Sequence, residues 1–162
     1  KPTTLNMKIP LSFLVMGDWG GSPDAPYTTD REIQTASGLN NVSTNLNASF
    51  VLALGDNFYD KGIPTDVNDQ RFQSTFEDVY NGESLQGPDF FRVLAGNHDH
   101  YGNVTAEVAY TDVSERWRFD SLYYSFVEKY GEDEGMSVEF LMIDTVVLVG
   151  QNLLKDGREV RV

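Results

Sequence analysis

The chain has 162 residues, of which 40% are hydrophobic and 12% aromatic, so it is long and apolar enough to fold around its own core. Acidic residues outnumber basic residues by 25 to 12, and the net charge of −13 argues against nucleic acid or an anionic membrane as the main partner. Cysteine is absent, which excludes thiolate catalysis, zinc–thiolate sites and disulfide bonds.

The chain begins at Lys1, without an initiator methionine or the apolar segment of a signal peptide. Either a targeting segment has been removed, or the sequence is an excerpt from a longer protein. No apolar run approaches the length of a membrane span, and we expect no membrane partner. Residues 1–10 contain two prolines and are expected to be extended. No repeat or linker divides the chain, which predicts one α/β unit.

The first predicted elements are a strand and a long helix. Residues 11–16 form an apolar run that predicts a buried strand, and Asp18 follows it closely. A helix is predicted to start at Thr29 or Asp30 and to run to about Asn47. Its apolar positions, at loosely helical spacing, are Ile33, Ala36, Leu39 or Asn40, and Leu46.

The second strand is predicted over residues 50–54, an apolar run that is closed by Gly55 and Asp56. One loop rich in glycine and proline precedes the long helix, and another follows the second strand. We expect these loops, at residues 20–28 and 60–68, to line a site and to shape its specificity.

A short helix and a third strand come next. The helix is predicted from about Asp69 to Tyr80. Residues 90–95 form a third apolar run, which ends just before Asn97. The helix has three apolar residues on one face, which we expect to lie in the core: Phe72, Phe76 and Val79.

The last part of the chain is predicted to be mainly strand. Residues 103–110 indicate a further short helix, and residues 122–130 alternate like a strand. An acidic turn follows at residues 131–135. Residues 137–149 predict either a strand pair or one long strand bent near Asp144, for which we expect a structural role.

The polar residues that end the three apolar runs are expected to meet. They lie about 40 residues apart, which is room for a crossover helix and a parallel return strand. Ligands gather at the carboxyl edge of such sheets. Carboxylate, amide and phenol oxygens are hard donors that suit hard or borderline cations. The sequence therefore predicts a metal site formed by Asp18, Asp56, Tyr59 and Asn97.

The blocks around these residues resemble the first three signature blocks of the purple acid phosphatases, within the calcineurin-like metallophosphoesterases. They read Asp18-Trp19-Gly20, Gly55-Asp56-Asn57-Phe58-Tyr59 and Gly96-Asn97-His98-Asp99. The similarity is closest to the small, tartrate-resistant type and covers nearly the whole chain. It implies that residues 1–162 are one C-terminally truncated domain, the N-terminal half of an αββα sandwich of mixed sheets flanked by helices.

The resemblance implies that Asp18 and Tyr59 ligate a first metal, that Asp56 bridges two metals, and that Asn97 ligates the second. The chemistry of the residues agrees, because one carboxylate can hold two cations about 3.5–4 Å apart. The implied cofactors are Fe(III) and a second divalent metal: Fe, Zn or Mn. The implied reaction is hydrolysis of phosphate monoesters by attack of a metal-bound hydroxide.

The histidine block offers one catalytic candidate. His98, beside Asn97, is expected to donate a proton or a hydrogen bond to the phosphoryl oxygens or the leaving group. Asp99 is expected either to orient an imidazole or to close a turn. We expect His100 to contact the rim of the site or to be a surface residue.

The family's remaining ligands are three histidines, in blocks of the form Val-x-x-His and Gly-His-x-His, and neither block occurs in this chain. We therefore expect an N-terminal portion of an active phosphatase, inactive alone, whose partner is the missing C-terminal half. The alternative is a non-catalytic fragment or a metal-binding homologue. A phosphodiesterase is a minor variant among enzymes.

Three Asn-x-Ser/Thr triplets occur, at Asn41, Asn47 and Asn103. Chance alone predicts about 1.5 of them in a chain of this composition. We expect Asn103 to be the glycosylated residue, because Asn41 lies on the predicted helix and Asn47 abuts a strand. The family resemblance implies secretion or a lysosomal-type compartment.

Overall fold

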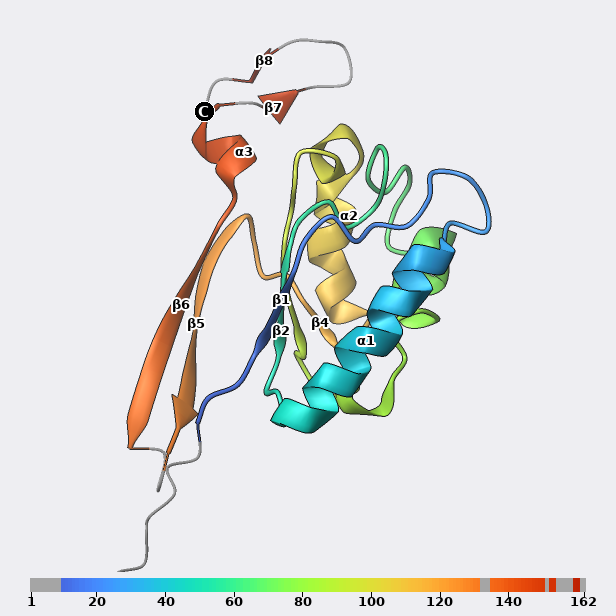
Figure 1. Cartoon of the computed structure of the whole chain (residues 1–162). Helices are drawn as coiled ribbons and strands as arrows, with labels where there is room; N and C mark the ends of the chain where they lie inside the picture. Colours follow the sequence, from blue (N-terminus) through green and yellow to red (C-terminus); the bar gives the residue numbers. More distant parts are fainter. Residues whose placement is uncertain (1–9, 132–134, 151, 154–158, 161–162) are drawn as a thin grey trace, which may run out of the picture.

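The computed structural model describes residues 10–131, 135–150, 152–153 and 159–160 (Figure 1). The expected lead-in at residues 1–9 and most of the acidic turn lie outside this range. The strands are β1 (Leu14–Met16), β2 (Val51–Leu54), β3 (Phe91–Leu94), β4 (Trp117–Arg118), β5 (Tyr123–Tyr130), β6 (Met136–Ile143), β7 (Asn152–Leu153) and β8 (Glu159–Val160). The helices are α1 (Asp30–Leu46), α2 (Val104–Ala109) and α3 (Thr145–Leu148), with shorter helical turns η1 (Phe72–Glu77), η2 (Glu83–Leu85), η3 (Asp99–Tyr101) and η4 (Tyr110–Asp112).

The three predicted apolar strands are parallel neighbours, as expected. The sheet has the order β1-β2-β3-β4, and Val51 of β2 lies opposite both Leu14 of β1 and Phe91 of β3. Helices α1 and α2 lie on one side of this sheet, and the antiparallel hairpin β5–β6 lies on the other (Figure 1). The mixed α/β class is confirmed.

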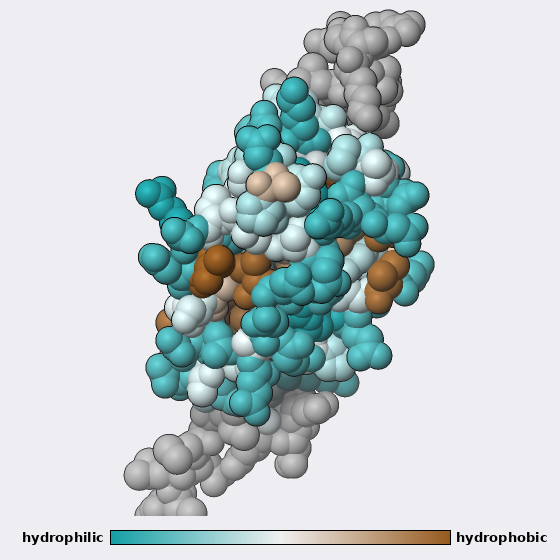
Figure 2. Space-filling model, turned by 90° about the vertical axis from the view of Figure 1, so that its right-hand side faces the viewer, coloured by the Kyte–Doolittle hydropathy of each residue, from teal (hydrophilic) through white to brown (hydrophobic). Residues whose placement is uncertain are grey.

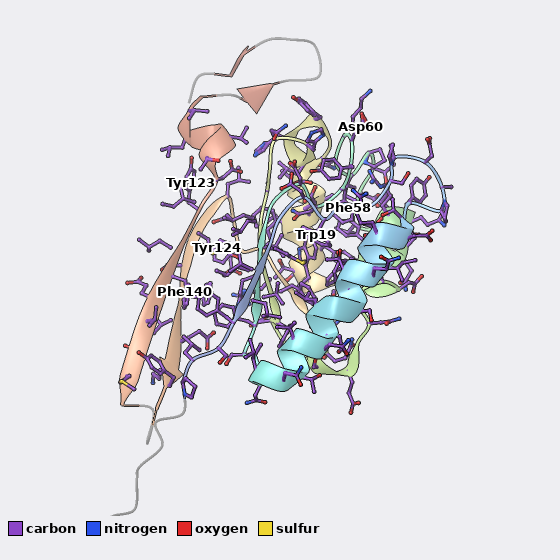
Figure 3. All side chains as sticks on the ribbon, viewed as in Figure 1. Trp19, Phe58, Asp60, Tyr123, Tyr124 and Phe140 are labelled. Carbon is purple, nitrogen blue, oxygen red and sulfur yellow. The ribbon has the colours of Figure 1, made fainter. Side chains whose placement is uncertain are left out.

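Aromatic rings fill the space between the sheet and the helices. Trp19, Phe58, Phe76 and Trp117 are at most 4% exposed, and their ring centroids lie 5.1–6.2 Å apart. Burying one such side chain stabilises the fold by about 1.5–3 kcal/mol. Figure 3 shows Phe58 and Trp19 beneath the loop that carries Asp60. The loops at the carboxyl edge of the sheet therefore rest on a rigid base.

The long helix forms where it was predicted, but it buries fewer of its apolar residues. Thr29 caps α1 and exchanges hydrogen bonds with Glu32, and Asn47 ends the helix in the left-handed conformation with φ of 48°. Ala36 is buried, whereas Ile33 and Leu46 are 51% and 52% exposed. The outer face of this side of the molecule is largely hydrophilic (Figure 2).

The segment from Asp69 to Tyr80 is not a regular helix. Gln70 and Arg71 are α-helical, but η1 continues from them as a π-helical turn, in which the backbone N–H of Asp78 donates to Gln73 O at 2.9 Å. Phe72 and Phe76 are nevertheless in the core, as predicted, and Val79 packs partly against it. The spacing of the apolar residues identified the buried face but not the hydrogen-bond pattern.

The prediction of strand over residues 137–149 is wrong for its second part. β6 ends at Ile143, and α3 follows. The reason is Asp144, whose Oδ1 accepts hydrogen bonds from the backbone N–H groups of Val146 and Val147 and so caps a helix.

The hairpin leaves apolar surface open. Val15 and Leu54 of the parallel sheet are 54% and 47% exposed, and Val127 and Leu141 of the hairpin are 55% and 68% exposed. Exposed apolar surface of this kind is typical of interaction sites. None of the helices in the described ranges has the length and apolar character that crossing a bilayer needs.

Candidate metal centre

The loops that follow β1, β2 and β3 lie side by side. The backbone N–H groups of Asp18 and Trp19 donate to the carbonyls of Gly55 and Asp56 at 3.1 and 3.2 Å. A Cβ added to Gly55 would lie 2.4 Å from Gly96 N. Glycine is therefore needed for this close approach, and the predicted convergence of three strand ends is present.

Two of the predicted ligands have unusual backbone conformations. Asp18 and Asp56 have φ of 56° and 52°, in the left-handed region. Aspartate tolerates this region better than most residues, yet such strain is of order 1 kcal/mol or more and clusters at functional sites. The strained turns direct both carboxylates toward one side chain, that of Tyr59.

The phenol of Tyr59 lies between the two carboxylates. Its oxygen is 2.8 Å from Asp18 Oδ1 and 3.0 Å from Asp56 Oδ2. A phenol has one hydrogen and satisfies only one acceptor at a time, so two carboxylates and a third oxygen converge with too few protons between them. This donor set fits a hard cation.

The pKa of Tyr59 is raised well above its ordinary value. The main cause is desolvation by burial, and the hydrogen bonds to Asp18 and Asp56 raise it further. In the protein alone, Tyr59 is therefore a neutral donor. A bound cation reverses the sign of the local field and favours the ionised phenol instead.

Asn97 lies at the same edge and is exposed. It follows Gly96, where an added Cβ would lie 2.2 Å from Asp56 Oδ1. The structure thus brings the side chains of Asp18, Asp56 and Tyr59 into contact. Asn97 itself is not in this contact, but its neighbour Gly96 packs against Asp56.

His98 is held beside the converging oxygens by two bonds. Its backbone N–H donates to Asp56 Oδ1 at 3.1 Å, and its ring Nδ1 lies 2.6 Å from Asp60 O. A carbonyl only accepts, so Nδ1 carries a hydrogen and Nε2 carries one only in the imidazolium form. The ring also packs edge-on against that of Tyr59, with centroids 4.8 Å apart.

A buried polar network that the sequence did not reveal supports the three loops. Asn57, which is fully buried, accepts from Trp19 Nε1 at 2.9 Å and donates to Glu107 Oε2 at 3.0 Å. Desolvation by burial raises the pKa of Glu107. The side chain of Arg71 donates to the carbonyls of Gly62 and Tyr59, and so connects the end of the loop after β2 to its beginning. Short motifs carry no signal for such long-range pairs.

Asp99 belongs to the same network. Its carboxylate accepts from the backbone N–H groups of Asn57, Phe58 and Gly96 at 2.7–3.1 Å. Of the two roles expected for it, orienting an imidazole and closing a turn, no imidazole bond is seen among the described residues, and only the bond from Gly96 is local; the bonds from Asn57 and Phe58 reach a different loop. They hold the loops after β2 and β3 together.

The expectation for His100 is wrong. Its Nε2 lies 2.7 Å from Asp144 Oδ2, and the two side chains are only 7% and 0% exposed. The side chain of His100 is therefore buried, and it contacts the β6–α3 junction. A single histidine in a turn gives no sequence signal for a partner 44 residues away.

One hollow borders the converging oxygens, and a second lies farther along the loop after β2, beside Asp60. The first, of about 280 Å³, is lined by Asp18, Tyr59, Arg31 and Glu32. The other, of about 480 Å³, lies between the two loops that were expected to shape specificity and includes Tyr27, Asp60 and Lys61 among its lining residues. The first hollow thus carries one cationic side chain, Arg31, and the second carries two, Lys61 and Arg71, in an otherwise acidic protein.

Within the described ranges, no group of three or more His, Cys, Asp or Glu side chains is arranged to hold a metal. The candidate set here consists of two carboxylates, a phenol and an amide. The oxygens fit part of a metal site.

The chain is similar to a known protein family and to several known proteins. Residues 11–158 match the family model described as calcineurin-like phosphoesterase. Over 142 residues, the chain is 48% identical to tartrate-resistant acid phosphatase type 5 of Oryctolagus cuniculus, covering 88% of this chain and 43% of that protein. It is 37% identical over 135 residues to purple acid phosphatase 7 of Arabidopsis thaliana, covering 83% of this chain and 37% of that protein.

The fold is also similar to a solved structure, that of GAP50, the anchor in the inner membrane complex of Plasmodium. The TM-score is 0.74 and the identity 25%, over 90% of this chain and 45% of that one. The chain thus spans less than half the length of these relatives.

Proposed function

The chain belongs to the calcineurin-like phosphoesterase family, and from that premise we propose that it is the N-terminal portion of a binuclear metal-dependent acid phosphatase acting on phosphate monoesters. The observation that carries the proposal is the convergence of Tyr59 with Asp18 and Asp56 at 2.8 and 3.0 Å. The sequence similarity to tartrate-resistant and purple acid phosphatases over most of the chain supports it.

Four residues are proposed as metal ligands. Asp18 and Tyr59 would hold Fe(III), Asp56 would lie between both ions, and Asn97 would hold the second, divalent ion: Fe, Zn or Mn. When bound, the ions supply the activated water and the positive charge that a phosphoryl group needs in an acidic protein.

His98 is proposed to act on the leaving group. Asp60 O holds Nδ1–H, so Nε2 is the ring atom that is free to deliver a proton. The edge-on contact with Tyr59 and the backbone bond to Asp56 keep the ring beside the site. His98 thus carries a proton at Nε2 only when the ring is charged.

The rest of the protein is the proposed partner, because the imidazole ligands have to come from beyond these residues. Val15, Leu54 and Leu141 expose apolar surface on the sheet and the hairpin, and we propose that the missing C-terminal half covers it. We further propose that the protein is a glycoprotein of a secretory or lysosomal-type compartment. Asn103 is the proposed glycan site.

The second candidate is a non-catalytic fragment or metal-binding homologue. It is favoured by the incomplete donor set in the described ranges. The reading frame beyond Val162 separates the two candidates, because only the phosphatase requires a Gly-His-x-His block there.

The direct test uses the full-length protein and its Asp56→Asn variant. We expect two metal ions and hydrolysis of a chromogenic phosphate ester at about pH 5 in the parent, where a metal-activated water is still available. Asp56→Asn removes one carboxylate oxygen from the position between the ions, and we expect it to lose most metal and nearly all activity. Retention of both by the variant would rule out the proposed role of Asp56.

A further inference from the structure

A buried hydrogen bond between two side chains joins the β6–α3 junction to the turn η3, in the loop that follows β3. His100 Nε2 lies 2.7 Å from Asp144 Oδ2, and neither side chain is more than 7% exposed. Because an ionised carboxylate only accepts, Nε2–H of His100 donates. Buried hydrogen bonds of this kind orient groups more firmly than exposed ones, since no water competes for either partner.

Asp144 is itself fixed at three further points. Its Oδ1 accepts from Val146 N and Val147 N at 2.9 and 3.0 Å, and its own N–H donates to Leu122 O at 3.0 Å. Both carboxylate oxygens are therefore in use, one for the cap of α3 and one for His100. The acceptor that His100 meets cannot shift without breaking the cap.

On the other side, the turn η3 is anchored to the parallel sheet. Asp99 accepts from backbone N–H groups in the loop after β2 and from Gly96, and His98 N–H donates to Asp56. Three consecutive residues thus have three separate anchors: His98 on Asp56, Asp99 on the loop after β2, and His100 on the β6–α3 junction. The bond from His100 ties this turn to the layer that carries the β5–β6 hairpin and α3.

We propose that His100 and Asp144 form a positioning pair for the site, which holds η3 so that the ring of His98 keeps Nδ1 on Asp60 O and Nε2 toward the substrate. The proposal rests on the phosphatase function proposed above. Neither residue touches substrate, so the pair acts through His98. Outer residues that orient a reacting group typically change activity by about 10–100-fold when they are lost.

The test compares three variants of the full-length protein. His100→Ala removes the donor. His100→Gln keeps a side-chain N–H donor, and Asp144→Ser keeps a cap for α3 but is too short to reach His100. We expect His100→Ala and Asp144→Ser each to lower kcat by about 10–100-fold with unchanged KM and metal content, and His100→Gln to regain most of the loss.

The double variant His100→Ala/Asp144→Ser should lose no more than either single variant, because both remove the same bond. If His100→Ala does not fold, Asp144→Ser alone decides the matter. Normal kcat in Asp144→Ser, a loss that follows metal content, or no recovery in His100→Gln would each overturn the proposal.

A second measurement does not depend on activity. Imidazole ¹⁵N spectra of the metal-free protein report which ring nitrogen of His98 carries the hydrogen, and we expect Nδ1–H in the parent and a mixture of tautomers in Asp144→Ser. An unchanged tautomer would overturn the positioning role. A full-length parent without metal or activity, in which the tautomer still changes, would instead place the failure with the proposed function.

Discussion

Replacing His98 with alanine in the full-length protein is expected to lower kcat without loss of metal. The backbone N–H that bonds Asp56 Oδ1 at 3.1 Å is retained by alanine, whereas the ring that contacts Asp60 and Tyr59 is lost. The variant therefore keeps the orientation of Asp56 and loses the proton at Nε2. Loss of such a proton donor lowers turnover by about 10²–10⁴-fold, which corresponds to about 2.7–5.4 kcal/mol of transition-state stabilisation.

The assay compares two phosphate esters. A nitrophenolate leaves without a proton, whereas an alkoxide needs one, so the loss should be much larger for an alkyl phosphate than for a nitrophenyl phosphate. His98→Asn is the matched control, because its amide still offers an N–H to Asp60 O but carries no acidic proton, and it should lose as much as alanine. Equal losses for both esters would refute the role as a proton donor, and loss of metal would make His98 a ligand.

The remaining predictions concern colour, pH and packing. Tyrosinate bound to Fe(III) is expected to give the iron-loaded protein a visible absorption band. Tyr59→Phe should abolish this band while the fold survives, because a phenyl ring packs but does not ligate; an unchanged spectrum would place the chromophore elsewhere. Burial raises the pKa of Glu32 from 4.5 to about 7, so the folded state binds more protons than the unfolded state between these pH values and stability falls as pH rises through that window. Glu32→Gln keeps a side chain suited to the capping box. It should reduce the fall in melting temperature of the metal-free protein as pH rises through this window, and an equally steep fall in the variant would show that Glu32 is not its cause. Phe76→Ala, at a fully buried ring, should lower the free energy of unfolding by about 3–5 kcal/mol in denaturant titrations, and a loss below about 1 kcal/mol would mean that the core closes around the gap.

The parallel sheet and its polar edge were predictable from local sequence. Runs such as residues 50–54 have no alternation and end in glycine, and this pattern indicates a strand covered on both faces. Parallel strands point their carboxyl ends to one edge, so the approach of Asp18 and Asp56 followed from topology alone. Tyr59 lies three residues beyond Asp56, close enough for one turn to bring its phenol to both carboxylates.

The long-range partners were not predictable. The apolar run from Val146 to Val149 suits a strand or a helix equally, and the cap from Asp144 decided for a helix. The burial of His100 depends on Asp144, and the role of Asp99 depends on backbone N–H groups in another loop. Local sequence patterns do not predict which distant group forms the hydrogen bonds of a buried polar side chain.

The most direct test of the proposed metal site is a crystal structure of the full-length protein with anomalous data collected at the iron edge. We predict an anomalous peak bounded by the oxygens of Asp18, Asp56 and Tyr59, at the position where the phenol now meets both carboxylates. A metal-loaded, active protein whose iron peak lies away from these three residues would contradict it.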